Sequence, residues 1–239
     1  MEIYAVPIRH PISRAAYEKL LQLPGKAKRE KIERYRRWKD AHFSLVADLL
    51  VRLKIKERTH LENHRILFAT NEYGKPVLAS EADARAAKIH FNVSHSGEWI
   101  ACAISDTPVG IDIERMDPSI DLSIARNFFS HPEYGHIERC GTRHEKVSLF
   151  YDYWTLKESF VKAVGKGLSI PFDSFAIRMD GGHIRVQTAE PGVFRFKTYD
   201  FRDGYKLAVC AAGDRVDFPS RIIELEMEDV VRKALEELA

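Results

Sequence analysis

The sequence predicts an α+β fold in which helices and antiparallel hairpins occur in both halves of the chain. Apolar side chains recur every three or four positions over residues 40–54 and 148–164, which indicates two amphipathic helices. Short apolar runs bounded by turn residues predict strands at 88–94, 99–104, 175–179, 183–187, 193–199 and 206–211. The segments do not match well enough to establish an internal repeat.

The composition indicates a folded globular protein. Of 239 residues, 45% are hydrophobic and 30% are charged, and a chain of this length can bury the core of one large domain or two smaller ones. The formal net charge is +2, from 37 Lys and Arg against 35 Asp and Glu. No overall field therefore favours nucleic acid or a membrane as the main partner.

The cysteines and the first residues bear on location. Cys102, Cys140 and Cys210 are odd in number and far apart, which favours reduced thiols over a disulfide framework, with Cys102 and Cys210 in core-forming runs. Residues 1–9 lack the basic start and apolar stretch of a signal peptide and indicate a first strand, and no later run is long enough to span a bilayer. We therefore expect a cytoplasmic protein that does not enter a membrane.

Residues 26–39 are dense in positive charge. Ile32, Tyr35 and Trp38 recur there at helical spacing among basic and acidic residues, which predicts one amphipathic helix with a solvated basic face. A stripe that binds nucleic acid is the alternative. Lys28 and Lys31 lie three positions apart on one face and could bind one phosphate together.

The predicted helix at 40–54 has a core-facing stripe that begins at Phe43, and Asp40 is its expected N-cap. A strand at 65–69 is expected next. The following run, Asn71-Glu72-Tyr73-Gly74-Lys75-Pro76, has the turn chemistry of a functional loop, although the same residues also suit a simple chain reversal.

Polar side chains gather where the 88–94 strand meets its turn, Ser96-Gly97-Glu98. Asn92, Ser94, His95 and Ser96 form this cluster. Hydroxyls and a histidine there could hold a phosphate, or they could satisfy the backbone groups of the turn.

The next strand, Gly110-Ile111-Asp112-Ile113-Glu114, carries two carboxylates one residue apart. Because side chains alternate faces along a strand, Asp112 and Glu114 project to one side and the two isoleucines are buried on the other. We expect this pair to lie close to the polar cluster of the hairpin. Alone it indicates a solvated strand edge, whereas a third acidic ligand would indicate a metal site.

The stretch 116–147 is irregular, with short helices expected at 124–129 and 131–140. Within it, Phe128-Phe129 is either core packing or a contact surface for another protein.

The predicted helix at 148–164 has an apolar side and a polar side. The apolar side is expected to be buried and comprises Phe150, Trp154, Leu156, Phe160 and Val161. The polar side comprises Thr155, Glu158, Ser159, Lys162 and Lys166. An ordinary surface ion pair such as Glu158 with Lys162 is worth only about 0.3–0.5 kcal/mol. An antiparallel meander over 175–211 and a charged helix at 227–238 complete the predicted elements.

Three of these motifs together resemble a known family. Residues 110–114 and 154–168 (WTLKESFVKAVGKGL) look like the paired signature of the 4′-phosphopantetheinyl transferases, and residues 92–96 (NVSHS) resemble the family's third motif. The resemblance is closest to the Sfp-type branch, which activates peptide and polyketide synthases in nonribosomal peptide and antibiotic biosynthesis. It extends over nearly the whole chain.

The resemblance implies an intramolecular pseudo-dimer of two similar halves, each with a small antiparallel sheet packed on helices, in a monomeric protein. Residues 1–107 would form the N-terminal half, with the nucleotide and 3′-phosphate contacts. Residues 108–239 would form the C-terminal half, with the metal site, the carrier-docking surface and the terminal helix. Coenzyme A would bind in the cleft between them.

The implied reaction transfers the 4′-phosphopantetheine arm of coenzyme A to a serine of an apo peptidyl or acyl carrier protein and releases adenosine 3′,5′-bisphosphate. The family's metal ligands fall on Asp112, Glu114 and Glu158, which suit Mg²⁺, with Mn²⁺ as an alternative. Glu158, directly or through a metal-bound water, would accept the serine proton, and Lys162 would help to neutralise the pyrophosphate. Replacing Asp112 or Glu158 by Ala is expected to abolish turnover and leave the fold intact, because carboxylates that face solvent contribute little stability.

The family's contacts to coenzyme A also carry over. They fall on Lys28, Lys31, Ser44, Tyr73, Gly74, Lys75, Pro76, Ser94, His95 and Lys162. Tyr73 to Pro76 would line the adenine pocket, and most of the others would surround the 3′-phosphate. Where close relatives often have Arg and Thr, this chain has Phe43 and Ser44, which predicts weaker binding of that phosphate.

Two other functions fit parts of the sequence. A carrier-protein or coenzyme A binding module without activity would keep some of the motifs, but the complete acidic trio disfavours it. A nucleic-acid binder using residues 26–39 is disfavoured by the near-neutral charge. Within the family, the short homotrimeric synthase type is disfavoured by the length of the chain, which suffices for both halves.

Overall fold

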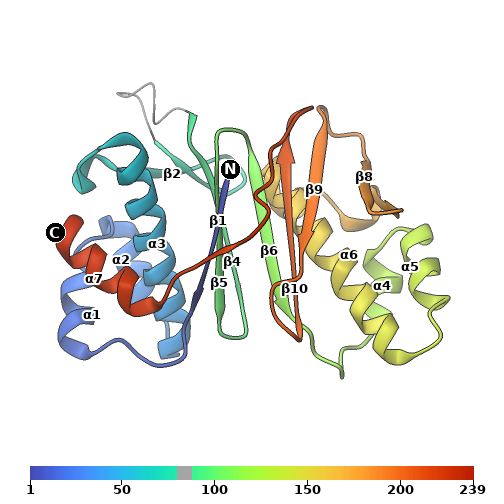
Figure 1. The fold of residues 1–239 in the computed structure, drawn as a ribbon, viewed down its shortest axis with the longest axis horizontal. Helices are drawn as coiled ribbons and strands as arrows, with labels where there is room; N and C mark the ends of the chain where they lie inside the picture. The colour runs from blue at the N-terminus through green and yellow to red at the C-terminus, as the bar shows by residue number, and fades with distance from the viewer. Residues whose placement is uncertain (80–87) are drawn as a thin grey trace.

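The computed structural model describes residues 1–79 and 88–239 and shows two α+β halves side by side (Figure 1). The helices are α1 (Arg14–Leu20), α2 (Lys26–Glu33), α3 (Trp38–Thr59), α4 (Ser123–Phe128), α5 (His131–Glu138), α6 (Arg143–Val164) and α7 (Met227–Glu237). The strands are β1 (Glu2–Pro7), β2 (Phe68–Thr70), β3 (Pro76–Leu78), β4 (His90–Ser96), β5 (Trp99–Ser105), β6 (Val109–Arg115), β7 (Ala176–Asp180), β8 (His183–Gln187), β9 (Phe194–Tyr199), β10 (Tyr205–Ala212) and β11 (Ile223–Glu224). Three-residue 3₁₀ turns lie at Asn63–Arg65, Gly167–Ser169 and Phe172–Ser174. No helix in the described ranges is long and apolar enough to cross a membrane.

Two sheets stack in the middle of the molecule, and one long helix covers the outer face of each (Figure 1). The first sheet has the order β11-β1-β5-β4 and packs on α3, and the second has the order β6-β10-β9 and packs on α6. Three apolar clusters result, one under each helix and one between the sheets. The predicted α+β fold with two halves is confirmed.

The strands at the centre are apolar on both faces because each face meets a packed layer. On β5, Ile100 and Cys102 pack toward α3, whereas Ala101 and Ala103 pack toward the second sheet. On β10, Cys210 packs toward α6. The predicted core positions of Cys102 and Cys210 are therefore confirmed, and the three cysteines are free thiols.

The single helix predicted over 26–39 is wrong. Helix α2 ends at Glu33, and Arg37 has an extended backbone (φ −97°, ψ 130°) immediately before α3 begins. Tyr35 and Trp38 are consequently exposed, and only Ile32 of the expected apolar stripe is buried. Asp40 lies in the first turn of α3 rather than at its N-cap, where a carboxylate still interacts favourably with the helix dipole. The strand predicted at 65–69 begins later, because a 3₁₀ turn occupies Asn63–Arg65.

Helix α6 begins five residues before the predicted start. Thr142 and Glu145 form a capping box, in which each side chain accepts a hydrogen bond from the other residue's backbone N–H. The polar side predicted for this helix is only partly exposed. Thr155 and Ser159 are buried, and their hydroxyls donate to carbonyl oxygens of the preceding turn.

The meander predicted over 175–211 is two separate sheets. β7 and β8 pair only with each other, whereas β9 and β10 extend the sheet that contains β6. The chain then returns to the first half, where β11 pairs parallel with β1 and α7 buries Met227 and Val230 in the first core. The division at 107/108 therefore does not describe the packing of residues 223–238.

Gly110 brings the backbone of β6 directly onto α6. A Cβ at this position would overlap the carbonyl oxygen of Ser159 and the backbone nitrogen of Ala163. Neither backbone atom can move without shifting the helix, so Gly110→Ala is expected to lower the free energy of unfolding by about 3 kcal/mol. Urea denaturation measures this. The control is Gly135→Ala within α5, where a Cβ meets nothing closer than 3.8 Å. Equal stability of the two variants would contradict the close contact.

Candidate active site

The edges of the two sheets meet where β4 runs beside β6, and side chains of β4 bind β6 at every second residue. Asn92 Oδ1 accepts a hydrogen bond from the backbone N–H of Ile111 (2.9 Å). Ser94 Oγ donates to Asp112 Oδ1 (2.8 Å), and Ser96 Oγ donates to Glu114 Oε2 (2.7 Å). The polar cluster of the hairpin and the two carboxylates are therefore neighbours, as predicted.

Lys162 brings α6 to the same place. Its ammonium donates to Asp112 Oδ1 (2.6 Å) and to Ser94 Oγ (3.1 Å), and it lies 4.0 Å from Glu158 Oε2. The predicted ion pair with Glu158 along the helix is therefore the longest of these three contacts. Lys162 thus links helix α6 to the carboxylate of Asp112 on β6.

Asp112 is not on a solvated strand edge, because only 2% of the residue is exposed. Burial raises the pKa of Asp112, opposed by Lys162. Burial and the charge of Asp112 raise the pKa of Glu114 to about 7. Burial also raises the pKa of Glu158, opposed by Lys162 and reinforced by Asp112. Three carboxylates therefore share one lysine, and the site lacks positive charge.

A divalent cation fits this deficit. Asp112 Oδ2 is buried and has no hydrogen-bond partner among the described residues, and carboxylate oxygens are the donors that Mg²⁺ prefers. Within residues 1–79 and 88–239, however, no three His, Cys, Asp or Glu side chains are already arranged to hold a metal ion. The ammonium of Lys162 binds Asp112 instead. The metal ligand set remains a prediction.

Comparison with known proteins identifies the family. A model described as "4'-phosphopantetheinyl transferase superfamily" matches residues 108–210, and one described as "4'-phosphopantetheinyl transferase, N-terminal" matches residues 10–107. The chain is 40% identical to 4′-phosphopantetheinyl transferase Sfp of Bacillus subtilis strain 168, over 97% of this chain and 100% of that protein. The chain belongs to the 4′-phosphopantetheinyl transferase superfamily.

Other relatives agree. The transferase named ffp of Bacillus subtilis is 41% identical over 95% of this chain and 99% of that protein. The transferase named gsp of Aneurinibacillus migulanus is 38% identical over 88% of this chain and 86% of that protein.

The first half of this transferase carries the predicted phosphate contacts His95 on β4 and Lys28 and Lys31 on α2. Ring stacking on Phe43 of α3 orients His95, with ring centroids 4.8 Å apart and planes within 6°. Burial lowers the pKa of His95, and the charges of Lys162 and Lys28 lower it further. Burial also lowers the pKa of Lys28, and the charge of Lys31 adds to the effect. Lys28 and Lys31 thus lie close together as predicted. Ser44 follows Phe43 and is half-buried.

The loop between β2 and β3 places Lys75 differently from the expected phosphate contact. Its ammonium donates to the backbone carbonyls of Lys162 (2.5 Å) and Val109 (3.0 Å). Burial lowers the pKa of Lys75 to about 8. Tyr73 of the same loop is 42% exposed.

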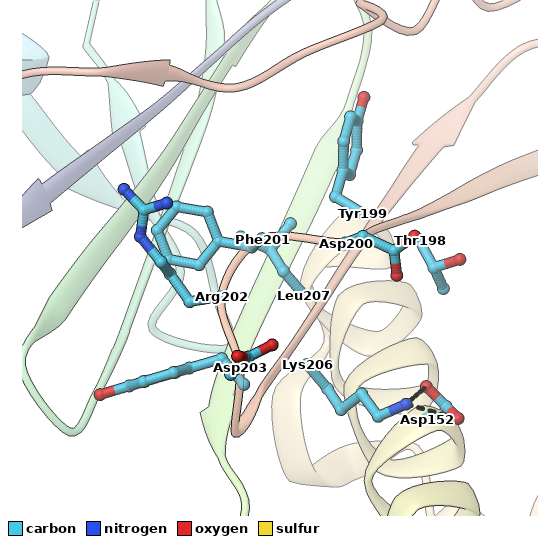
Figure 2. A pocket seen from close by; sticks show the side chains of 10 residues that line it. Asp152, Thr198, Tyr199, Asp200, Phe201, Arg202, Asp203, Lys206 and Leu207 are labelled. Atoms are coloured by element: carbon cyan, nitrogen blue, oxygen red, sulfur yellow. Dashed lines mark hydrogen bonds and ion pairs between the residues drawn. The ribbon is translucent and has the colours of Figure 1, made fainter.

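A cavity of about 320 Å³ opens elsewhere, beside the turn between β9 and β10 (Figure 2). Lys206 points toward Asp152 of α6 and donates to Asp152 Oδ2 (3.0 Å). None of the predicted site residues lines this cavity. This cavity therefore does not mark the carboxylate site.

Sequence reasoning missed the way Ser96 holds Glu114. Its hydroxyl donates to the carboxylate and also accepts from the N–H of Arg115 (3.0 Å). Ser96→Ala leaves both groups without this partner, so it is expected to lower the free energy of unfolding by about 1–2 kcal/mol in urea denaturation. Ser119→Ala, which removes an exposed hydroxyl bonded to Asp117, is the control and should change stability less. Equal losses would contradict the bridging role.

Proposed function

We propose that this transferase moves the 4′-phosphopantetheine group of coenzyme A to a serine of an apo carrier protein, with Mg²⁺ held by Asp112, Glu114 and Glu158. The observation that carries the proposal is the group of three partly or fully buried carboxylates with one lysine, at the junction of the two halves. Mg²⁺ bound there would neutralise charge on the pyrophosphate of coenzyme A.

The residues of the chain then have distinct roles. Lys28, Lys31, Ser44, Ser94 and His95 bind the nucleotide phosphates, and the loop from Tyr73 to Pro76 lines the adenine pocket. The side chain of Lys162 turns from Asp112 toward the pyrophosphate, where the charge of its ammonium stabilises the transition state.

The chemical step is an in-line displacement. The serine oxygen forms a bond to the phosphorus nearest the pantetheine, and the bond from that phosphorus to the bridging oxygen breaks. Adenosine 3′,5′-bisphosphate leaves with the electron pair of that bond. Glu158, directly or through a water, accepts the serine proton.

The carrier protein docks on residues 116–140 and the adjoining face of α6 in this proposal. Phe129 is buried in the second core, but Phe128 on α4 is 55% exposed. Of the two readings of this pair, packing therefore applies to Phe129, and Phe128 is available for contact. The transferase acts as a monomer, because both halves of the site lie in one chain.

The deciding experiment is a mass measurement. Protein, Mg²⁺, coenzyme A and an apo carrier are incubated, and the carrier is expected to gain the mass of one phosphopantetheine. Peptidyl and acyl carriers are tested in parallel. If none of several carriers gains mass, the proposal is refuted. If the carriers gain mass with Mg²⁺ present but not when Mg²⁺ is omitted, the result supports the metal assignment.

A further inference from the structure

The loop between β2 and β3 belongs to the first half but is attached to the end of α6 in the second half. Asn71 Nδ2 donates to the carbonyl oxygen of Gly165 (2.7 Å). Lys75 Nζ donates to the carbonyl oxygens of Lys162 and Val109. Two side chains of the loop therefore hold three backbone carbonyls of the other half.

These carbonyls need such partners. The last four carbonyl groups of a helix receive no hydrogen bond from an N–H of the same helix. A cation or a side-chain amide near the C-terminus can donate to them, and a cation also interacts favourably with the helix dipole. The carbonyl of Lys162 is one of these four, and Gly165 is the left-handed C-cap (φ 83°). The loop thus caps the helix that carries Glu158 and Lys162.

The contact is also tightly packed. A Cβ at Gly165 would lie 3.1 Å from Lys75 Cδ and 3.2 Å from Asn71 Nδ2, so either side chain would have to shift by a few tenths of an ångström to admit it. The side chains of Lys75 and Asn71 therefore lie directly against the end of α6.

Asn71 has a second role in the same amide group. Its Oδ1 accepts hydrogen bonds from the backbone N–H of Tyr73 (3.0 Å) and of Lys75 (2.8 Å). This is the local bonding by which Asn fixes a turn. One oxygen therefore shapes the loop, and one nitrogen attaches the loop to the helix.

We propose that Asn71 is a positioning residue for the transfer reaction, which couples the loop 71–76 to the end of α6. The inference rests on the proposed function, in which the loop binds adenine and α6 carries the catalytic side chains. The position of the bound nucleotide and the position of Lys162 both depend on the side-chain amide of Asn71.

The two roles of Asn71 can be separated by substitution. Asn71→Asp keeps the oxygen that accepts from Tyr73 and Lys75, but it replaces the donor nitrogen with an oxygen that repels the carbonyl of Gly165. The KM for coenzyme A is expected to stay within about twofold, whereas kcat falls about 10- to 100-fold, because small displacements of catalytic groups have effects of this size. Backbone amides of residues 163–166 should exchange hydrogen faster.

The control is Gln187→Glu on β8, an exposed position with the same change from amide to carboxylate. It should leave kcat, KM and exchange at 163–166 unchanged. If Asn71→Asp does not fold, Asn71→Ser replaces it, because the hydroxyl can still accept from the turn but is too short to reach Gly165.

The outcomes are distinguishable. Wild-type kcat in the Asn71 variant, or a loss confined to KM, would overturn the positioning role while the proposed function stands. A wild-type protein that modifies no carrier would refute the proposed function itself. In that case, unchanged exchange at 163–166 in Asn71→Asp would overturn the attachment of the loop as well.

Discussion

Glu158→Gln is expected to lower the rate of phosphopantetheine transfer by about 10³-fold, the size of effect typical of a lost general base. Glutamine has nearly the same shape but neither the charge nor the basicity of the carboxylate. The stability should change little, since the side chain is 28% exposed and its contact with Lys162 is 4.0 Å long. Carrier mass and the urea midpoint are measured on the same preparation.

Glu236→Gln on α7 is the matched control, because it removes an exposed carboxylate far from the site. It should be fully active. Near-normal transfer by Glu158→Gln would remove Glu158 from both of its proposed roles. Asp112 is a less clean test: it was expected to face solvent, and the structure shows that this is wrong. Because Asp112 is buried and bonded to Ser94 and Lys162, Asp112→Ala is expected to lose stability as well as activity.

Lys157→Met is expected to lower the free energy of unfolding by about 3–5 kcal/mol. Lys157 has no exposed surface, and its ammonium lies 2.9 Å from Glu133 Oε2. It also donates to the carbonyls of Phe172 (2.7 Å) and Phe175 (2.8 Å). Methionine fills the space but leaves a buried carboxylate and two carbonyls without their cation.

Urea denaturation tests this effect. Lys146→Met on the same helix removes a partly exposed ion pair with Glu138 (3.3 Å) and should cost less than about 1 kcal/mol. The double variant Lys157→Met/Glu133→Gln should lose less free energy of unfolding than the two single variants lose in total, since the two charges interact. A loss below 1 kcal/mol for Lys157→Met would contradict the buried pair.

Local patterns predicted the parts of the site that depend on one element. The alternation along residues 110–114 correctly assigned Ile111 and Ile113 to the core and the two carboxylates to the other face. The Thr-x-x-Glu pattern of the capping box is present at Thr142 and Glu145, although the predicted helix began only at residue 148.

The remaining features depend on contacts between elements distant in sequence. Lys157 has the appearance of a surface residue in the middle of a helix, and only the packing of α5 against α6 shows that Glu133 neutralises it. Similarly, the sequence predicted that the cluster containing Ser96 lies near Glu114, but it did not predict the bond between the two side chains, because β4 and β6 belong to different sheets.

The return of residues 223–238 to the first half has a consequence for synthesis on the ribosome. Strand β11 completes the first sheet, and α7 supplies Met227, Val230 and Ala234 to the core beneath α3. The N-terminal half therefore exposes apolar surface until these late residues emerge, although domains commonly fold as they are made. The first half to be translated is thus the last to be completed, and nascent chains stalled before residue 223 should be protease-sensitive there.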